Sequence, residues 1–147
     1  MGDVIEQAKV ILHAMTLDVP AGSKLYGVMP GDEVKVKATI QYRGPDAYSD
    51  TFYAAIGNHL IVFDEYWIGW TGVNFAPSDD WATYELTVDI PITKIANFPW
   101  TPGWFDIYAK LTKAGKATPR LDNVIEVLLA AEFRNFGIAS YDRIPGV

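Results

Sequence analysis

The 147-residue chain contains no cysteine and only two histidines, His13 and His59. Without cysteine it cannot form disulfide bonds, thiolate zinc sites or a cysteine nucleophile. The histidines do not form a His-x-x-x-His pair, so a histidine metal site would need ligands from distant parts of the chain. We therefore expect no metal and no other cofactor, and we place His59 in a solvent-facing turn after Gly57-Asn58.

Basic residues are also few, since 12 Lys and Arg against 18 Asp and Glu give a net charge of −6. An acidic chain repels a phosphate backbone, so we expect no nucleic-acid partner. No apolar run approaches the roughly 18–20 residues of a membrane helix. Asp3 and Glu6 stand where a secretory signal carries basic residues. We expect no membrane insertion and no signal peptide. Localisation stays open, with a virion or an extracellular assembly among the alternatives.

Motifs of common enzymes are missing as well. The sequence has no Gly-x-Ser-x-Gly motif, no glycine-rich phosphate loop and no serine with an obvious catalytic partner. The acidic pairs Asp64-Glu65 and Asp79-Asp80 could contribute to a calcium site, but the Asp-x-Asp-x-Asp-Gly pattern is absent. We interpret both pairs as solvated turns and expect that the protein is not an enzyme.

Apolar residues make up 50% of the chain and charged residues 20%, which suffices for the core of one compact domain. Strict alternation of apolar and polar residues predicts strands over 33–43, 81–90 and 104–111. Aromatic and β-branched runs predict two more over 50–56 and 60–70. We expect an all-β, antiparallel β-sandwich of about seven to nine strands that covers residues 1–147 as a single domain.

Two segments are ambiguous between strand and helix, residues 4–15 within the N-terminal stretch 1–18 and residues 124–136. Val4, Ile5, Ala8 and Ile11 have helical spacing, whereas Val10-Ile11-Leu12 can begin a strand. In the second segment Val-Ile-Glu-Val favours a strand. Residues 134–147 form a C-terminal tail.

Three turn-rich stretches carry a resemblance to a known family. They are Met29-Pro30-Gly31-Asp32-Glu33-Val34 through Tyr42-Arg43-Gly44, Pro102-Gly103-Trp104-Phe105-Asp106-Ile107, and Asp122-Asn123-Val124-Ile125-Glu126. In these the chain resembles the immunoglobulin-like adhesion modules called CARDB domains. The resemblance implies an immunoglobulin-like sandwich that serves as a non-catalytic module of a larger surface or structural assembly, and it implies no binding residue.

Aromatic residues are abundant, with 5 Trp, 8 Tyr and 7 Phe. Phe105, Tyr84 and Tyr42 fall on the inferred buried faces, so we expect them in the core. A candidate exposed platform remains, consisting of Trp67, Trp81, Trp104 and Tyr108. Such rings could stack on a carbohydrate, contact a neighbouring subunit, or pack within the chain under the 60–80 loop.

The last predicted strand is apolar on both faces from Val127 to Ala131, and an uncovered apolar edge would invite aggregation. We expect a neighbouring subunit to cover it, through Val127, Leu129, Ala131 and Phe133. The tail from Phe133 to Val147 could also reach that neighbour.

Together these features predict a structural or adhesive subunit of a larger assembly, such as a virion decoration, a filament or a surface structure. Its partners would be copies of itself or other structural subunits. The first alternative is a carbohydrate-binding module that uses the aromatic platform. The second is a small jelly-roll enzyme with an unrecognised carboxylate pair.

Overall fold

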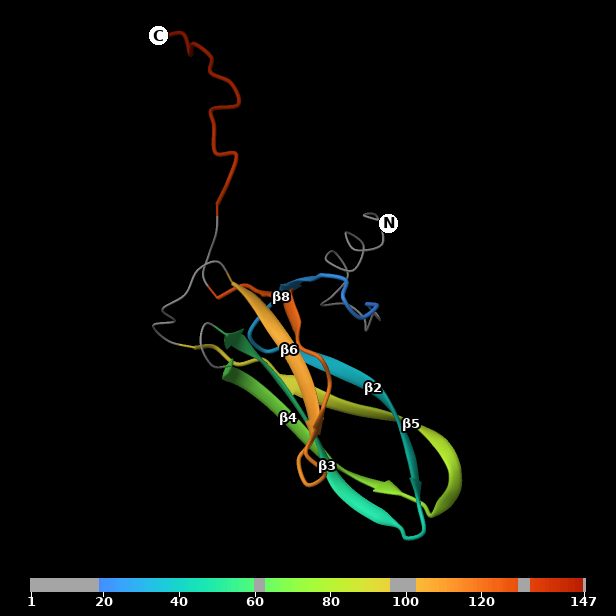
Figure 1. Cartoon of the computed structure of the whole chain (residues 1–147). Helices are drawn as coiled ribbons and strands as arrows, with labels where there is room; N and C mark the ends of the chain where they lie inside the picture. Colours follow the sequence, from blue (N-terminus) through green and yellow to red (C-terminus); the bar gives the residue numbers. More distant parts are fainter. Residues whose placement is uncertain (1–18, 60–62, 96–102, 130–132, 147) are drawn as a thin grey trace.

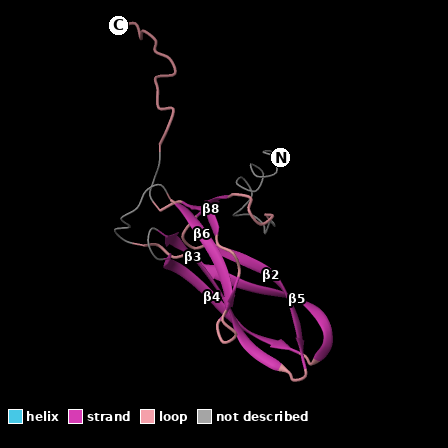
Figure 2. Cartoon of the chain, viewed as in Figure 1, coloured by secondary structure: helices cyan, strands magenta, loops and turns pink. Residues whose placement is uncertain are grey.

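The computed structural model describes residues 19–59, 63–95, 103–129 and 133–146. These residues form an all-β protein, as predicted, in which strands and connecting turns alternate without a helix (Figure 2). The strands are β1 (Leu25–Val28), β2 (Glu33–Gly44), β3 (Tyr48–His59), β4 (Phe63–Phe75), β5 (Ser78–Pro91), β6 (Trp104–Leu111), β7 (Lys116–Ala117) and β8 (Leu121–Val127). No helix in the described ranges is long and apolar enough to cross a membrane.

The strands form two sheets, and Figure 1 labels their longer strands. The larger sheet has the order β1-β8-β6-β3-β4, with the short β7 beside β6, and the smaller sheet consists of β2 and β5. Every pairing is antiparallel except that of β1 with β8, which is parallel. The predicted wholly antiparallel arrangement is therefore wrong at this edge. Two parallel strands need a long connection between them, and here the chain from β2 to β7 provides that connection.

The smaller sheet follows the alternation of the sequence. β2 and β5 pair continuously from Glu33↔Pro91 to Tyr42↔Ala82, which places Val34 opposite Ile90 and Val36 opposite Val88. These apolar side chains face the larger sheet, whereas Lys35 and other residues between them are exposed. Alternation with a period of two thus decides which face of each strand is buried.

The core fills the space between the two sheets. Its largest fully buried side chains are Phe52, Phe75, Phe105, Ile56 and Ile90. Burying each such side chain contributes roughly 1.5–3 kcal/mol, so this layer supplies most of the driving force for folding. The expected core position of Phe105 is confirmed, and the partly buried Tyr42 and Tyr84 pack against the same core.

One buried carboxylate fixes the turn after β6. Asp50 is 8% exposed and accepts hydrogen bonds from the backbone N–H groups of Thr51, Lys113 and Ala114 and from the hydroxyl of Tyr48. Burial alone would raise the pKa of Asp50, but these hydrogen bonds outweigh it and lower the pKa. The turn between β6 and β7 therefore forms around a side chain from another strand.

Several boundaries differ from the predicted ones. Residues 76 and 77 alone separate β4 from β5, so the expected 60–80 loop is wrong within the described residues. Asp79-Asp80 and Asp64-Glu65 lie inside strands rather than in turns, because β5 begins at Ser78 and β4 at Phe63. β8 ends at Val127, and the described residues beyond it form neither strand nor helix. Residues 4–15 lie outside the described ranges.

Candidate functional site

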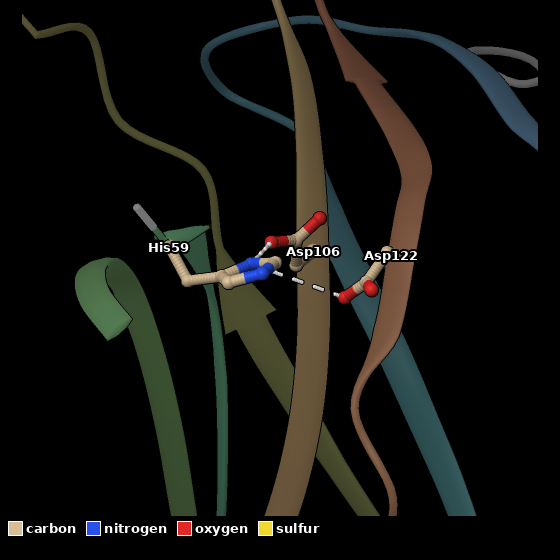
Figure 3. Close-up of side chains that lie close together, drawn as sticks. All are labelled: His59, Asp106 and Asp122. Carbon is tan, nitrogen blue, oxygen red and sulfur yellow. Dashed lines mark hydrogen bonds and ion pairs between the residues drawn. The ribbon is translucent and has the colours of Figure 1, made fainter. Parts of the chain in front are cut away.

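Four ionisable side chains converge on the outer face of the larger sheet. β3 ends at His59 and β6 carries Asp106, whereas Arg120 and Asp122 lie on either side of Leu121, the first residue of β8. Figure 3 shows the imidazole of His59 pointing toward the carboxylates of Asp106 and Asp122. We call these four residues the His59 cluster.

The hydrogen bonds of the cluster assign which ring nitrogen of His59 donates and which accepts. His59 Nδ1 lies 2.6 Å from Asp106 Oδ2, and His59 Nε2 lies 2.8 Å from a terminal guanidinium nitrogen of Arg120. Because arginine can only donate, Nε2 accepts, and Nδ1–H donates to the carboxylate. Arg120 also donates from Nε to Asp122 Oδ1 at 2.6 Å. This last hydrogen bond raises the pKa of Arg120 and lowers the pKa of Asp122.

Asp106 is the buried centre of the cluster, with 3% of its surface exposed. Its Oδ1 accepts the backbone N–H of Asn123 at 2.7 Å, so both carboxylate oxygens have partners. Asn123 has a φ of 52°, in the left-handed region that asparagine tolerates better than most residues. The local backbone at the start of β8 is thus shaped to hold the carboxylate of Asp106.

The cluster also has the residue types of a metal site, since ligand atoms of His59, Asp106 and Asp122 lie within 4.8 Å of one another. However, Arg120 already supplies a positive charge to Asp122 and occupies His59 Nε2. A divalent cation would have to displace that guanidinium. Both ring nitrogens of His59 are engaged, which leaves no lone pair for general-base catalysis. The geometry fits a polar clamp that joins β3, β6 and β8.

The prediction that His59 lies in a solvent-facing turn is wrong. Its side chain is 33% exposed and sits at the end of a strand, held by residues 47 and 61 positions away in the chain. The predicted alternation did place Asp106 on the outward face of β6. That face is covered here because His59 and Arg120 lie over it, which no local pattern indicates.

A second cluster lies beside the first, on the same outer face. The hydroxyls of Tyr53 and Tyr108 each donate to one oxygen of Glu65. The ring of Phe63 packs edge-on against Tyr108 at 4.9 Å, and Lys110 Nζ lies 4.9 Å from the ring centre of Tyr53. The pKa of both tyrosines is raised, mainly by burial and to a smaller extent by the contact with Glu65. The pKa of Tyr108 is raised to about 12.

The four aromatic residues of the predicted platform do not come together. Trp67 is 3% exposed and belongs to the core, where its indole N–H donates to the carbonyl of Thr93. It is buried because it lies on the inward face of β4, opposite Ile56. Trp81 is 58% exposed but belongs to the smaller sheet, where Arg43 lies over its ring at 4.6 Å.

Trp104 and Tyr108 do share the outward face of β6, on either side of Asp106. Trp104 packs edge-on against Tyr26 at 5.4 Å, and Lys24 Nζ lies 4.7 Å from its ring centre. Tyr108 turns instead toward Glu65. The His59 cluster therefore separates the two rings.

The residues predicted to form the subunit contact also lie in different surroundings. Val127, the last residue of β8, is 1% exposed, and Leu129, two residues beyond the strand, packs against the core. These two positions are thus corrected to intrachain packing. Ala131 lies outside the described residues. Phe133 is 88% exposed.

Phe133 begins a segment that we call the arm, residues 133–146, which extends away from the sandwich (Figure 1). Its large apolar side chains are almost wholly exposed, with values of 88% for Phe133, 97% for Phe136, 85% for Ile138, 91% for Tyr141 and 90% for Ile144. The arm has neither strand nor helix.

Comparison of the chain with models of protein families, with curated proteins and with solved structures finds no match.

Proposed function

We propose that the protein is a non-catalytic subunit of a larger structural or adhesive assembly, held to its neighbours by the arm. The observation that carries the proposal is the exposure of five large apolar side chains on one extended segment. Apolar groups concentrated in this way mark interaction sites rather than solvated surface. Burying them against a partner would contribute roughly 1.5–3 kcal/mol per side chain, from which the cost of ordering the arm is subtracted.

We further propose that the sandwich is immunoglobulin-like. The order β1-β8-β6-β3-β4 opposite β2-β5, with the first strand parallel to the last, supports this assignment. A rigid sandwich with an extended terminal arm suits a virion decoration, a filament or a surface structure, and the CARDB resemblance implies the same kind of role. These specific assemblies rest on analogy of fold.

Solution mass tests the proposal. Light scattering coupled to size exclusion, at two protein concentrations, should find an oligomer or a growing polymer for the unmodified chain. An arm variant with Phe136→Ser, Ile138→Ser and Tyr141→Ser should elute as a monomer. A control with Asn135→Ser and Ser140→Ala, in the same arm, should assemble normally. A chain that stays monomeric at both concentrations would overturn the proposal.

The carbohydrate-binding alternative has less support. Trp67 is in the core, Trp81 belongs to the other sheet, and Asp106, the carboxylate between Trp104 and Tyr108, is buried. A sugar would therefore meet single rings rather than a platform. It would be favoured if Trp104→Ala with Tyr108→Ala abolished retention on a glycan column while the solution mass stayed unchanged.

A further inference from the structure

We propose that the arm of one copy docks on the outer face of β3, β4 and β6 of a second copy, at a surface formed by Tyr53, Ile68, Trp70 and Tyr108. We call these four residues the aromatic face. This inference rests on the proposed function, because it names the partner of the arm and the place where the arm binds.

The register of the larger sheet makes the aromatic face continuous. Trp70 pairs with Tyr53 across β4 and β3, two residues from Ile68, which pairs with Ala55. Ala55 in turn pairs with Tyr108 of β6. Trp70 is 66% exposed and Ile68 is 44% exposed, whereas the small Ala55 between the larger side chains is wholly covered. Side chains at directly paired positions lie about 4.5–5.5 Å apart, so these groups form one surface.

Other exposed apolar side chains of the described sandwich offer no comparable surface. Met29 lies in the turn between β1 and β2, and Trp81 lies on the smaller sheet, with no second exposed large apolar side chain on its strand. Trp70 and Ile68 instead lie two residues apart on one face of the same strand. The aromatic face is therefore the surface whose chemistry matches a segment rich in Phe, Ile and Tyr, since aromatic anchors dominate the centres of interfaces.

Charge supports the same pairing. Glu65 is exposed on β4 and contacts two members of the aromatic face, Tyr53 and Tyr108. The arm carries exposed Arg134 and Arg143 with one acidic residue, Asp142. Opposite charges at the rim of an interface favour the correct register and the correct partner.

The path of the arm favours a second copy over its own sandwich. In Figure 1 the arm continues away from the end of the sandwich at which β8 finishes. At 3.3–3.6 Å per residue, residues 133–146 span up to roughly 46–50 Å, which exceeds the width of three strands several times. An arm directed outward with this reach meets the face of a neighbour without reversing its direction.

Complementation between two variants tests the inference. A surface variant with Ile68→Thr and Trp70→Thr keeps β-forming residues, and Trp81→Thr is its control on the other sheet. The surface variant should weaken self-association at least tenfold, as the arm variant does, and the control should not. An equimolar mixture of the surface variant and the arm variant should recover a complex, because one supplies the arm and the other supplies the face.

The outcomes separate the inference from the proposed function. If the arm variant is monomeric but the surface variant assembles normally, the arm binds elsewhere and the inference fails while the proposed function stands. If the unmodified chain is monomeric, both fail. If both variants are monomeric but their mixture forms no complex, the inference also fails.

A cross-linking measurement decides the case in which the surface variant misfolds. The chain has no cysteine, so introduced cysteines are unique. An I68C chain mixed with an I138C chain should form a disulfide-linked heterodimer under mild oxidation. A T39C chain, substituted on the exposed face of β2, should form far less heterodimer with I138C. Equal yields from the I68C and T39C chains would overturn the inference.

Discussion

His59, at the end of β3, donates Nδ1–H to the buried carboxylate of Asp106 on the neighbouring strand β6, with 2.6 Å between the two atoms. The bond ties the end of one strand to the outer face of the next. Because Asp106 also accepts the N–H of Asn123, a single carboxylate connects β3, β6 and the start of β8.

We expect Asp106→Ala to lower the free energy of unfolding by about 1–3 kcal/mol, because two donors lose a buried acceptor. Asp122→Ala, which removes an exposed partner of Arg120, should lower the free energy of unfolding much less, because solvent screens this pair. Urea unfolding followed by circular dichroism gives both values. Equal costs for the two variants would contradict the central role of Asp106.

The cluster also makes a prediction about metal ions. Zn²⁺ should not raise the melting temperature of the unmodified chain, because Arg120 occupies His59 Nε2 and neutralises Asp122. Arg120→Ala should free both groups, so that Zn²⁺ stabilises this variant as any ligand of the native state does. Thermal melts with and without Zn²⁺ test this. Stabilisation of the unmodified chain that is lost in His59→Ala would instead identify a native metal site.

Asp50 gives a prediction about acid stability. The pKa of Asp50 is lowered in the folded state, so its ionised form stabilises the fold above the unfolded pKa near 3.8. That contribution is lost as pH falls through the lower, folded pKa. Asp50→Asn should cost about 1–3 kcal/mol at pH 7. The difference from the unmodified chain should shrink below about pH 4, as measured by urea unfolding across pH. A constant difference would count against an ionised Asp50.

Tyr108 gives the corresponding prediction in alkali. Its pKa is raised from 10.0 to about 12, so the stabilisation that the neutral hydroxyl provides is present below pH 10 and is lost as pH rises toward 12. Glu65→Gln should shift the titration of Tyr108 toward its ordinary pKa, which the ultraviolet absorbance of tyrosinate reports. Lys116→Gln, at an exposed site on β7, is the control and should leave the titration unchanged.

Trp67 is buried and Trp81 is exposed, so their truncation should lower the free energy of unfolding by different amounts. Trp67→Ala creates a cavity in the core and should cost about 3–5 kcal/mol. Trp81→Ala, on the exposed face of the smaller sheet, should cost no more than about 1 kcal/mol, the value of its contact with Arg43. Similar losses in the free energy of unfolding for the two variants would contradict the buried position of Trp67.

Alternation was sufficient to predict most strands and their buried faces, as Val34, Val36 and Phe105 illustrate, because each position depends only on near neighbours. Trp67 could not be placed in this way. Its neighbours Tyr66 and Ile68 are also apolar, and the pairing of β3 with β4 shifts register between Ile56 and Gly57. Only the paired strand decides which of the three side chains faces inward.

The His59 cluster escaped prediction for a different reason. Its members are separated by 47 and 61 residues in the chain, so their meeting depends on which strands are neighbours. Asp106 alternates correctly as an outward residue, and nothing near it in sequence indicates that His59 and Arg120 cover it. The arm, by contrast, is one continuous segment, so its apolar residues can be recognised without knowing which strands of the sandwich are neighbours.

The parallel pairing of β1 with β8 has a mechanical consequence. The chain enters the sheet at Leu25 and leaves it at Val127, and the two strands run in the same direction, with Leu25 opposite Ile125 and Val28 opposite Val127. Tension applied between the chain before β1 and the arm after β8 therefore pulls the strands in opposite directions along their length. The hydrogen bonds between them are loaded together in shear, rather than broken one at a time as in an unzipping hairpin.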